Sequence, residues 1–155
     1  MVGPLHTGRY AIGGAANDVD DPVLAREGIR IGRDASPPDD PTIFAVVRLG
    51  LSLRILDRVT AHLAPRTVGG QKTLRQQSVM DTASHHLLHF SSIANLFDWD
   101  LPWRDTRLPA ERLGYVNREI SEGVAGISTL MGGHGYLVHG TSPLNYLCTL
   151  LENLA

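Results

Sequence analysis

Three closely spaced histidines are the residues that most directly suggest chemistry. His85 and His89 are one helical turn apart, so both could contact one metal ion from a single helix face, with His86 beside them. A zinc or di-iron site in a helical bundle also needs carboxylates at matched positions, as in a Glu-X-X-His pattern, and the sequence lacks this pattern. We therefore predict no metal site and interpret the three histidines as a polar or intersubunit helix face.

Two glycine-rich breaks offer backbone rather than side-chain chemistry. They read Arg66-Thr67-Val68-Gly69-Gly70, followed by Gln77, and Met131-Gly132-Gly133-His134-Gly135-Tyr136. Glycine raises the backbone entropy that is lost on ordering and has no side chain to pack, so a dense group of glycines does not continue a helix. Such a break can bring the backbone close to a ligand, but helix caps and turns use the same residues. Both interpretations are open for each break.

Composition excludes several classes of function. A chain of 155 residues fits one domain, and its net charge of −2, with arginines interleaved with acids, argues against a nucleic-acid partner. The sequence has no apolar run of the roughly 20 residues that cross a bilayer, and its start does not resemble a signal peptide. We expect a soluble cytoplasmic protein without a membrane partner. The single cysteine, Cys148, lies on an apolar helix face and is expected to be a buried small hydrophobe.

The first forty residues contain few large apolar side chains and no sustained hydrophobic period. Turn-forming residues recur in them, at Gly13-Gly14, at Asp21-Pro22 and over 37–41. We predict that residues 1–40 form an extended or weakly structured N-terminal arm.

Four later segments carry apolar residues spaced alternately three and four apart, which places them on one face of a helix. The first has Val46, Leu49, Leu53, Leu56 and Leu63 on one face and Phe44, Val47, Leu51 and Ile55 on a second. The second has Met80, Ala83, Leu87, Phe90, Ala94 and Phe97. The third has Leu113, Val116, Ile120, Ile127 and Leu130, with Gly123 and Gly126 permitting close helix approach. The fourth has Leu144, Leu147, Leu151 and Leu154, after a predicted N-cap at Thr141 or Ser142.

Successive helices of this kind, joined by short loops, are typical of antiparallel bundles with crossing angles near about 20°. The sequence therefore predicts an all-α fold, with an antiparallel four-helix bundle over residues 41–155.

The order and spacing of these features resemble the C-terminal helical domain of acyl-CoA dehydrogenases. The resemblance covers roughly residues 41 to 150 and rests on the stretch that starts at Gly50-Leu51-Ser52-Leu53, on Arg66-Thr67-Val68-Gly69-Gly70, on Gln77-Ser78-Val79 and on Gly132-Gly133-His134-Gly135-Tyr136. Acyl-CoA dehydrogenases are FAD-dependent tetramers in which this domain contacts the FAD of a neighbouring subunit.

The resemblance implies a role for four residues of this chain. Arg66 would pair with the FAD diphosphate, which suits a planar side chain that can bind phosphate with two hydrogen bonds. Gln77 would lie near the flavin, and the backbone of Gly132 and Gly133 would approach the adenosine half. The resemblance also implies a homo-oligomer, or a hetero-oligomer with an acyl-CoA dehydrogenase-type subunit, and an acyl thioester of CoA or of a carrier protein as substrate.

The catalytic base and the flavin wall depart from the family. Many members carry the base in a Glu-Gly-Thr motif after the glycine loop, and this motif does not occur here. Others place a glutamate just before the first bundle helix, where this sequence has Asp40, so Asp40 is the candidate base, with a helix N-terminal cap as its alternative. Gly69 and Gln76 stand where the family has aromatic residues.

We therefore expect a subunit or split piece of an acyl-CoA dehydrogenase-type enzyme that works with a flavin-bearing partner. The other family domains, which hold most of the flavin, have no counterpart in the first forty residues. Two alternatives stay open: a non-redox bundle that serves oligomerisation or carrier-protein docking, and a repurposed cyclase or dehydratase without flavin that uses Asp40 or a histidine.

Overall fold

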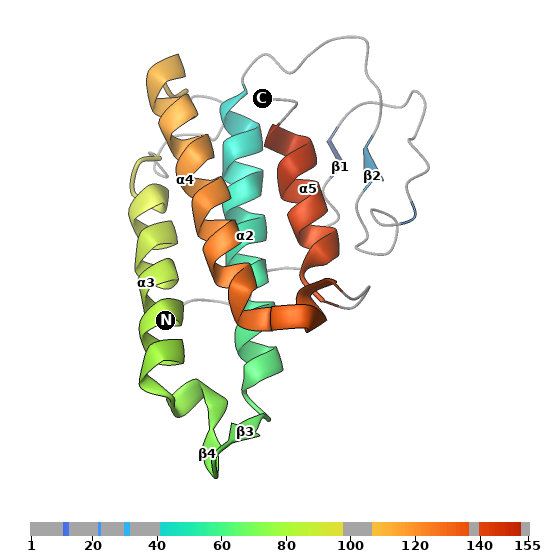
Figure 1. Cartoon of the computed structure of the whole chain (residues 1–155). Coiled ribbons are helices and arrows are strands. Elements are labelled where there is room, and N and C mark those ends of the chain that lie inside the picture. Colours follow the sequence, from blue (N-terminus) through green and yellow to red (C-terminus); the bar gives the residue numbers. More distant parts are fainter. Residues whose placement is uncertain are drawn as a thin grey trace. The chain divides into compact units, whose positions relative to one another are not determined.

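The computed structural model describes residues 11–12, 22, 30–31, 41–97, 107–136 and 140–152 (Figure 1). The chain divides into two compact units, Met1–Asp39 and Asp40–Ala155. In the first unit, strand β1 (Ala11–Ile12) pairs in parallel with strand β2 (Arg30–Ile31).

The described part of the second unit is mostly helical, which confirms the prediction of a mainly helical fold. Its α-helices are α2 (Thr42–Leu63), α3 (Gln77–Ala94), α4 (Ala110–Ser128) and α5 (Ser142–Glu152). A small antiparallel hairpin, β3 (Thr67–Val68) and β4 (Gln71–Lys72), and the 3-10 turn η1 (Thr73–Arg75) connect α2 to α3. A second 3-10 segment, η3 (Thr129–Tyr136), follows α4. No described helix is long and apolar enough to cross a membrane.

Helix α2 is the central element of this unit. It contacts α3, α4 and α5, and α4 in turn contacts α3 and α5, so the four helices lie side by side (Figure 1). Two apolar faces explain this position, because α2 buries residues from both predicted faces, including Leu49 and Leu56 from one and Leu51 and Ile55 from the other.

Helix α3 differs most from its predicted packing. The sequence pattern placed Met80 and Leu87 on the core face, but their exposed fractions are 45% and 50%, so this prediction was wrong. Only Phe90 and Ile93 are buried within the helix, and Phe97 is buried in the turn that follows it. The helix therefore attaches to its neighbours mainly through its C-terminal half.

Most core positions predicted for the last two helices are confirmed, but Leu130 is only half-buried, so its placement in the core was wrong. Gly123 and Gly126 of α4 allow the close approach that was expected, since each faces a ring of α3. At the start of α5, the Thr141 carbonyl accepts a backbone hydrogen bond from Asn145, but among the described residues its hydroxyl has no hydrogen-bond partner and provides no side-chain cap. Leu154 lies outside the described residues. The buried predicted positions are Leu113, Val116, Ile120, Ile127, Leu144, Leu147 and Leu151.

Candidate functional site

The first glycine-rich break forms the hairpin that leads from α2 to α3. Strands β3 and β4 pair so that Thr67 lies opposite Lys72, with Gly69 and Gly70 as the two residues of the turn. Their φ angles are +60° and +80°, and a tight turn with two positive φ angles is the conformation that glycine adopts without steric cost. The two glycines are therefore explained by the turn itself, with the backbone at its tip exposed.

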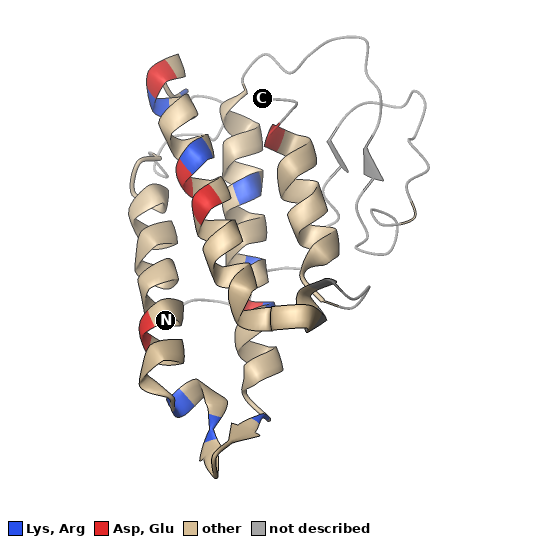
Figure 2. Cartoon of the chain, in the orientation of Figure 1, with Lys and Arg blue, Asp and Glu red and all other residues tan. Residues whose placement is uncertain are grey.

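Cations gather at this hairpin end of the helical unit (Figure 2). Residues 64–80 contain Arg66, Lys72 and Arg75 and no carboxylate. Lys72 donates to the carbonyl of Pro65 at 3.4 Å, whereas the guanidinium groups of Arg66 and Arg75 form no ion pair or hydrogen bond with any described residue. An anion, above all a phosphate, is the ligand that such a group of cations favours.

Gln77 lies at the same end, where it is the first residue of α3. Its side-chain amide donates to the carboxylate of Asp81, one turn further along the helix, at 2.7 Å. Both residues are exposed. The amide nitrogen of Gln77 thus already has a partner, while its carbonyl oxygen is available to a ligand.

The second glycine-rich break forms most of η3. Gly132 has φ +52° and ψ −142°, a backbone conformation that only glycine adopts readily, and it interrupts the helical turns of this segment. Both Gly132 and Gly133 are exposed, and a Cβ atom on either would meet nothing within 4 Å. The backbone at this turn is therefore open to a ligand, as it is at the hairpin tip.

One hydrogen bond fixes the segment after η3 against the central helix. The guanidinium of Arg58 on α2 donates to the carbonyl of Gly140 at 2.9 Å. The first glycine-rich break follows directly after α2, and η3 also contacts α2. No hydrogen bond or ion pair between described residues joins Arg66 or Gln77 to the η3 glycines.

The structure does not describe several of the residues that the sequence analysis singled out. Asp40, the candidate base, is not among the described residues, and the side chains of His134 and Tyr136 in the second glycine-rich break are also not described. Among the described residues, no group of three or more His, Cys, Asp or Glu side chains is arranged to hold a metal ion.

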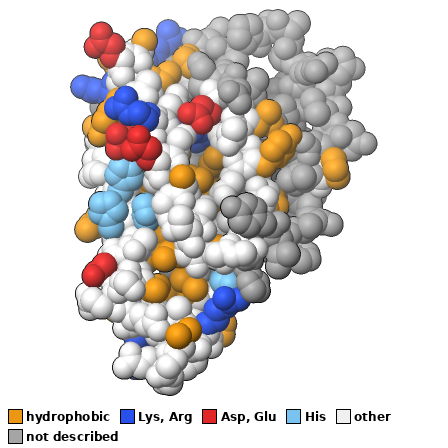
Figure 3. Space-filling model, viewed as in Figure 1, with side chains coloured by type: hydrophobic (Ala, Val, Ile, Leu, Met, Phe, Trp, Pro, Cys, Tyr) orange, Lys and Arg blue, Asp and Glu red, His pale blue; other side chains and the backbone are white. Residues whose placement is uncertain are grey.

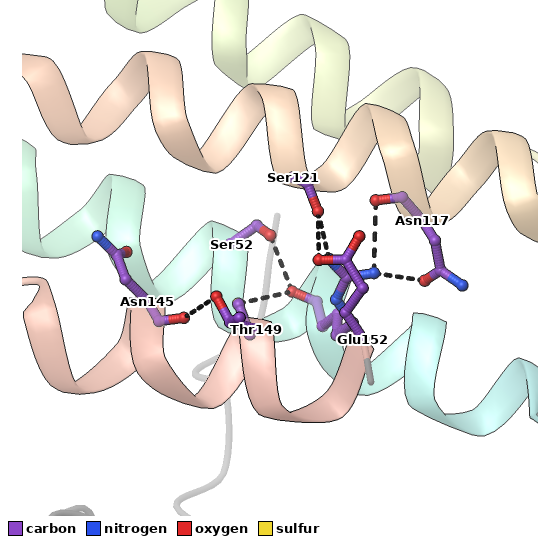
Figure 4. A network of polar contacts seen from close by, with 8 residues as sticks. Ser52, Asn117, Ser121, Asn145, Thr149 and Glu152 are labelled. Atoms are coloured by element: carbon purple, nitrogen blue, oxygen red, sulfur yellow. Dashed lines mark hydrogen bonds and ion pairs between the residues drawn. The ribbon is translucent and has the colours of Figure 1, made fainter. Parts of the chain in front are cut away.

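The most developed polar network was not predicted from the sequence. It is built around Arg48 of α2, which is 1% exposed. Figure 4 labels Asn117, Ser121 and Glu152, which belong to this network. Its guanidinium donates to Asn117 Oδ1 and to Ser121 Oγ, both on α4 and both at 2.6 Å. It also forms a 3.0 Å ion pair with Glu152 on α5, and the Ser121 hydroxyl donates to the same carboxylate at 2.9 Å. One buried cation thus connects three helices.

The backbone of Arg48 is a second centre of this network. Its carbonyl accepts hydrogen bonds from the Ser52 hydroxyl at 2.8 Å and from the Cys148 thiol at 3.9 Å. Burial raises the pKa of Cys148 to about 12, so the thiol stays protonated and is a poor nucleophile. Burial also lowers the pKa of Arg48, and Glu152 opposes this effect. The arrangement binds helices together, and its thiol is not activated for nucleophilic chemistry.

The sequence could not reveal this network, because its members lie on three segments and each has an ordinary surface residue type. A weak signal existed, since Arg48 lies between Phe44 and Ser52 at the helical spacing of a buried face. Comparisons with known proteins add no assignment: no family model, no curated protein and no solved structure matches this chain.

Proposed function

We propose that this chain is a cytoplasmic subunit or split piece of an acyl-CoA dehydrogenase-type enzyme, and that its helical unit is an antiparallel four-helix bundle that completes the FAD site of a partner. The observation that carries the proposal is the hairpin end of the unit, where Arg66, Lys72 and Arg75 stand without a carboxylate beside an exposed glycine turn. A group of cations without a carboxylate suits the negative charge of a diphosphate.

Each residue has a distinct task in this proposal. Arg66, whose guanidinium has no partner among the described residues, binds the diphosphate of FAD through charge-assisted hydrogen bonds. Gln77 offers its carbonyl oxygen to the flavin, with its amide held by Asp81. The open backbone of Gly132 and Gly133 lies against the adenosine half. When bound, FAD supplies the acceptor for the hydride in α,β-dehydrogenation of an acyl thioester.

The proposed reaction also needs a base that removes the α-proton of the thioester. Asp40 is the carboxylate that would take the α-proton of the thioester, and it immediately precedes the helical unit's first described residue. A partner subunit that supplies the base is compatible with the same site. In either case this chain's share of the site is anion binding and positioning.

Helix α3 supports the requirement for a partner. Its 18 residues include a single carboxylate, Asp81, and no lysine or arginine. Leu87 and Leu88 are 50% and 71% exposed. Exposed apolar side chains on a helix with so little charge are typical of a surface that another protein covers.

The same helix favours a second candidate function. A non-redox module for oligomerisation or carrier-protein docking would need the apolar face of α3 and would not need the cations of the hairpin. The two functions differ in one respect that can be measured, which is the presence of flavin.

The test is the flavin absorbance of the full chain, purified alone and after pull-down from its native cell extract. The proposal expects flavin together with a larger partner, and Arg66→Ala should weaken flavin retention by about tenfold or more, because a charge-assisted hydrogen bond contributes about 1.5 to 3 kcal/mol. Arg112→Ala, an exposed arginine on α4, is the matched control and should retain flavin. A colourless complex, or equal retention by both variants, would reject the flavin assignment.

A further inference from the structure

The contact between α3 and α4 is formed by two rings of α3 that occupy the places of missing side chains on α4. A Cβ atom added to Gly126 would lie 2.5 Å from Cε1 of His86, and one added to Gly123 would lie 2.5 Å from Cε1 of Phe90. The ring centroids of His86 and Phe90 are 6.2 Å apart. His86 is therefore packed against the backbone of α4, and any change at its ring acts directly on this contact.

His86 also belongs to a group of three imidazoles, in which the His85 ring lies next to both of the others. The ring centroids of His85 and His86 are 5.4 Å apart, and those of His85 and His89 are 6.3 Å apart. Figure 3 shows histidine side chains gathered on this face. The buried Nδ1 atom of His86 has no hydrogen-bond partner among the described residues. A proton on this Nδ1 atom would therefore have no hydrogen-bond acceptor among the described residues.

The described charged groups around the cluster do not place a counter-charge beside the His86 ring. On α4, Glu119 faces His89, with its carboxylate 3.7 Å and its carbonyl 3.1 Å from Nε2 of that ring, and Arg118 lies 3.9 Å from the same carboxylate. Glu122 of α4 and Asp81 of α3 are exposed. The titratable groups in the C-terminal half of α2, the other helix that packs on α3, are Arg54, Asp57, Arg58 and His62. Among described residues, His86 itself has no carboxylate within ion-pair distance.

Burial is the largest cause that lowers the pKa of His86, and the neighbouring His85 and His89 lower it further. A histidine whose pKa is lower in the folded state binds its proton more readily when its surroundings open. Its contribution to stability is therefore complete well above the ordinary histidine pKa of about 6.5 and is lost as the pH falls through that value. Acid thus favours any state in which the His86 ring has left α4.

We propose that the α3–α4 contact is an acid-sensitive joint, in which protonation of His86 releases α3 from Gly123 and Gly126 of α4. The joint opens locally because α3 buries only Phe90 and Ile93 within its length, whereas α2, α4 and α5 are also connected by the Arg48 network. Helices with few buried apolar contacts are the ones that open at low free-energy cost. This inference does not depend on the proposed function, because it uses neither the cations nor the glycine turns.

Amide hydrogen exchange of the full chain between pH 7.5 and pH 5.5, corrected for the intrinsic pH dependence of exchange, tests the joint. Exchange of the α3 amides should become several-fold faster at the lower pH, relative to those of α5. His86→Gln keeps a polar side chain that cannot be protonated and should abolish most of this acceleration. The control His85→Gln removes an exposed ring of the same cluster and should keep most of the acceleration, because burial is a larger cause of the lowered pKa of His86 than His85 is.

Two results would overturn the proposal. One is an α3 exchange rate that does not change relative to α5, and the other is an unchanged acid response in His86→Gln. If that variant fails to fold, NMR titration of the histidine rings in the unmodified chain decides the question. The His86 signal should titrate below about 6.5, together with amide shifts of α3. A midpoint at or above this value would reject the joint.

Discussion

Arg48 of α2 and Glu152 of α5 form a 3.0 Å ion pair whose two ends lie in very different surroundings. Arg48 is 1% exposed, whereas Glu152 is 40% exposed. The carboxylate retains part of its hydration, while the guanidinium has lost nearly all of its own, so the cation depends more strongly on the pair. The last turn of α5 therefore supplies the counter-charge for a cation buried in the central helix.

Glu152→Gln should lower the free energy of unfolding by about 1 to 3 kcal/mol, because it leaves the Arg48 guanidinium buried with a neutral partner. Urea denaturation followed by far-ultraviolet circular dichroism measures this change. Glu122→Gln, an exposed carboxylate on α4, is the control and should change stability by less than about 0.5 kcal/mol. Equal effects of the two substitutions would show that the ion pair contributes nothing specific.

Gly123→Ala and Gly114→Ala should have opposite effects on stability although both lie in α4. A Cβ atom at Gly123 meets the fully buried ring of Phe90 and should cost about 1 to 3 kcal/mol. At Gly114 a Cβ atom meets nothing within 4 Å, and the better helix propensity of alanine should add about 0.5 to 1 kcal/mol. Thermal unfolding of the two variants gives the comparison, and a stabilising Gly123→Ala would contradict the close packing of α3 on α4.

Comparing Gly132→Ala with Gly133→Ala separates the cost of a positive φ angle from the cost of a steric clash at the added Cβ atom. Neither Cβ atom would meet a neighbour, but only Gly132 has a positive φ. Alanine should therefore cost about 1 to 3 kcal/mol at position 132 and less than about 0.5 kcal/mol at position 133. Chemical denaturation of both variants measures the difference. A Gly133→Ala variant of normal stability then also reports, without a folding defect, whether a Cβ atom there obstructs a ligand.

Periodicity predicted the helices well because a helix that buries one face must repeat its apolar residues. Val116, Ile120 and Leu147 were placed in the core on this ground, and all three are buried. The antiparallel arrangement of the helices stays a prediction. The same rule failed at Met80 and Leu87, because periodicity shows that a helix has an apolar face but not which partner covers that face.

The candidate site also contains features that the sequence could predict and others that it could not. The hairpin glycines follow from local chain geometry, and the sequence indicated a break there. The burial of Arg48 could not be predicted, because its partners Asn117 and Ser121 are 69 and 73 residues away in sequence. Only the folded packing brings these residues together. The flavin roles of Arg66, Gln77, Gly132 and Gly133 rest on resemblance and stay predictions.

The connection between Arg48 and α5 also constrains the order in which the chain can mature during synthesis. The Cys148 thiol that contacts the Arg48 carbonyl is 100 residues further along the chain, and Glu152 follows it in the last turn of α5. Translation proceeds at about 5 to 20 residues per second, so synthesis of this stretch takes about 5 to 20 seconds, during which Arg48 lacks its α5 partners. Final closure of the core around α2 must follow the emergence of α5.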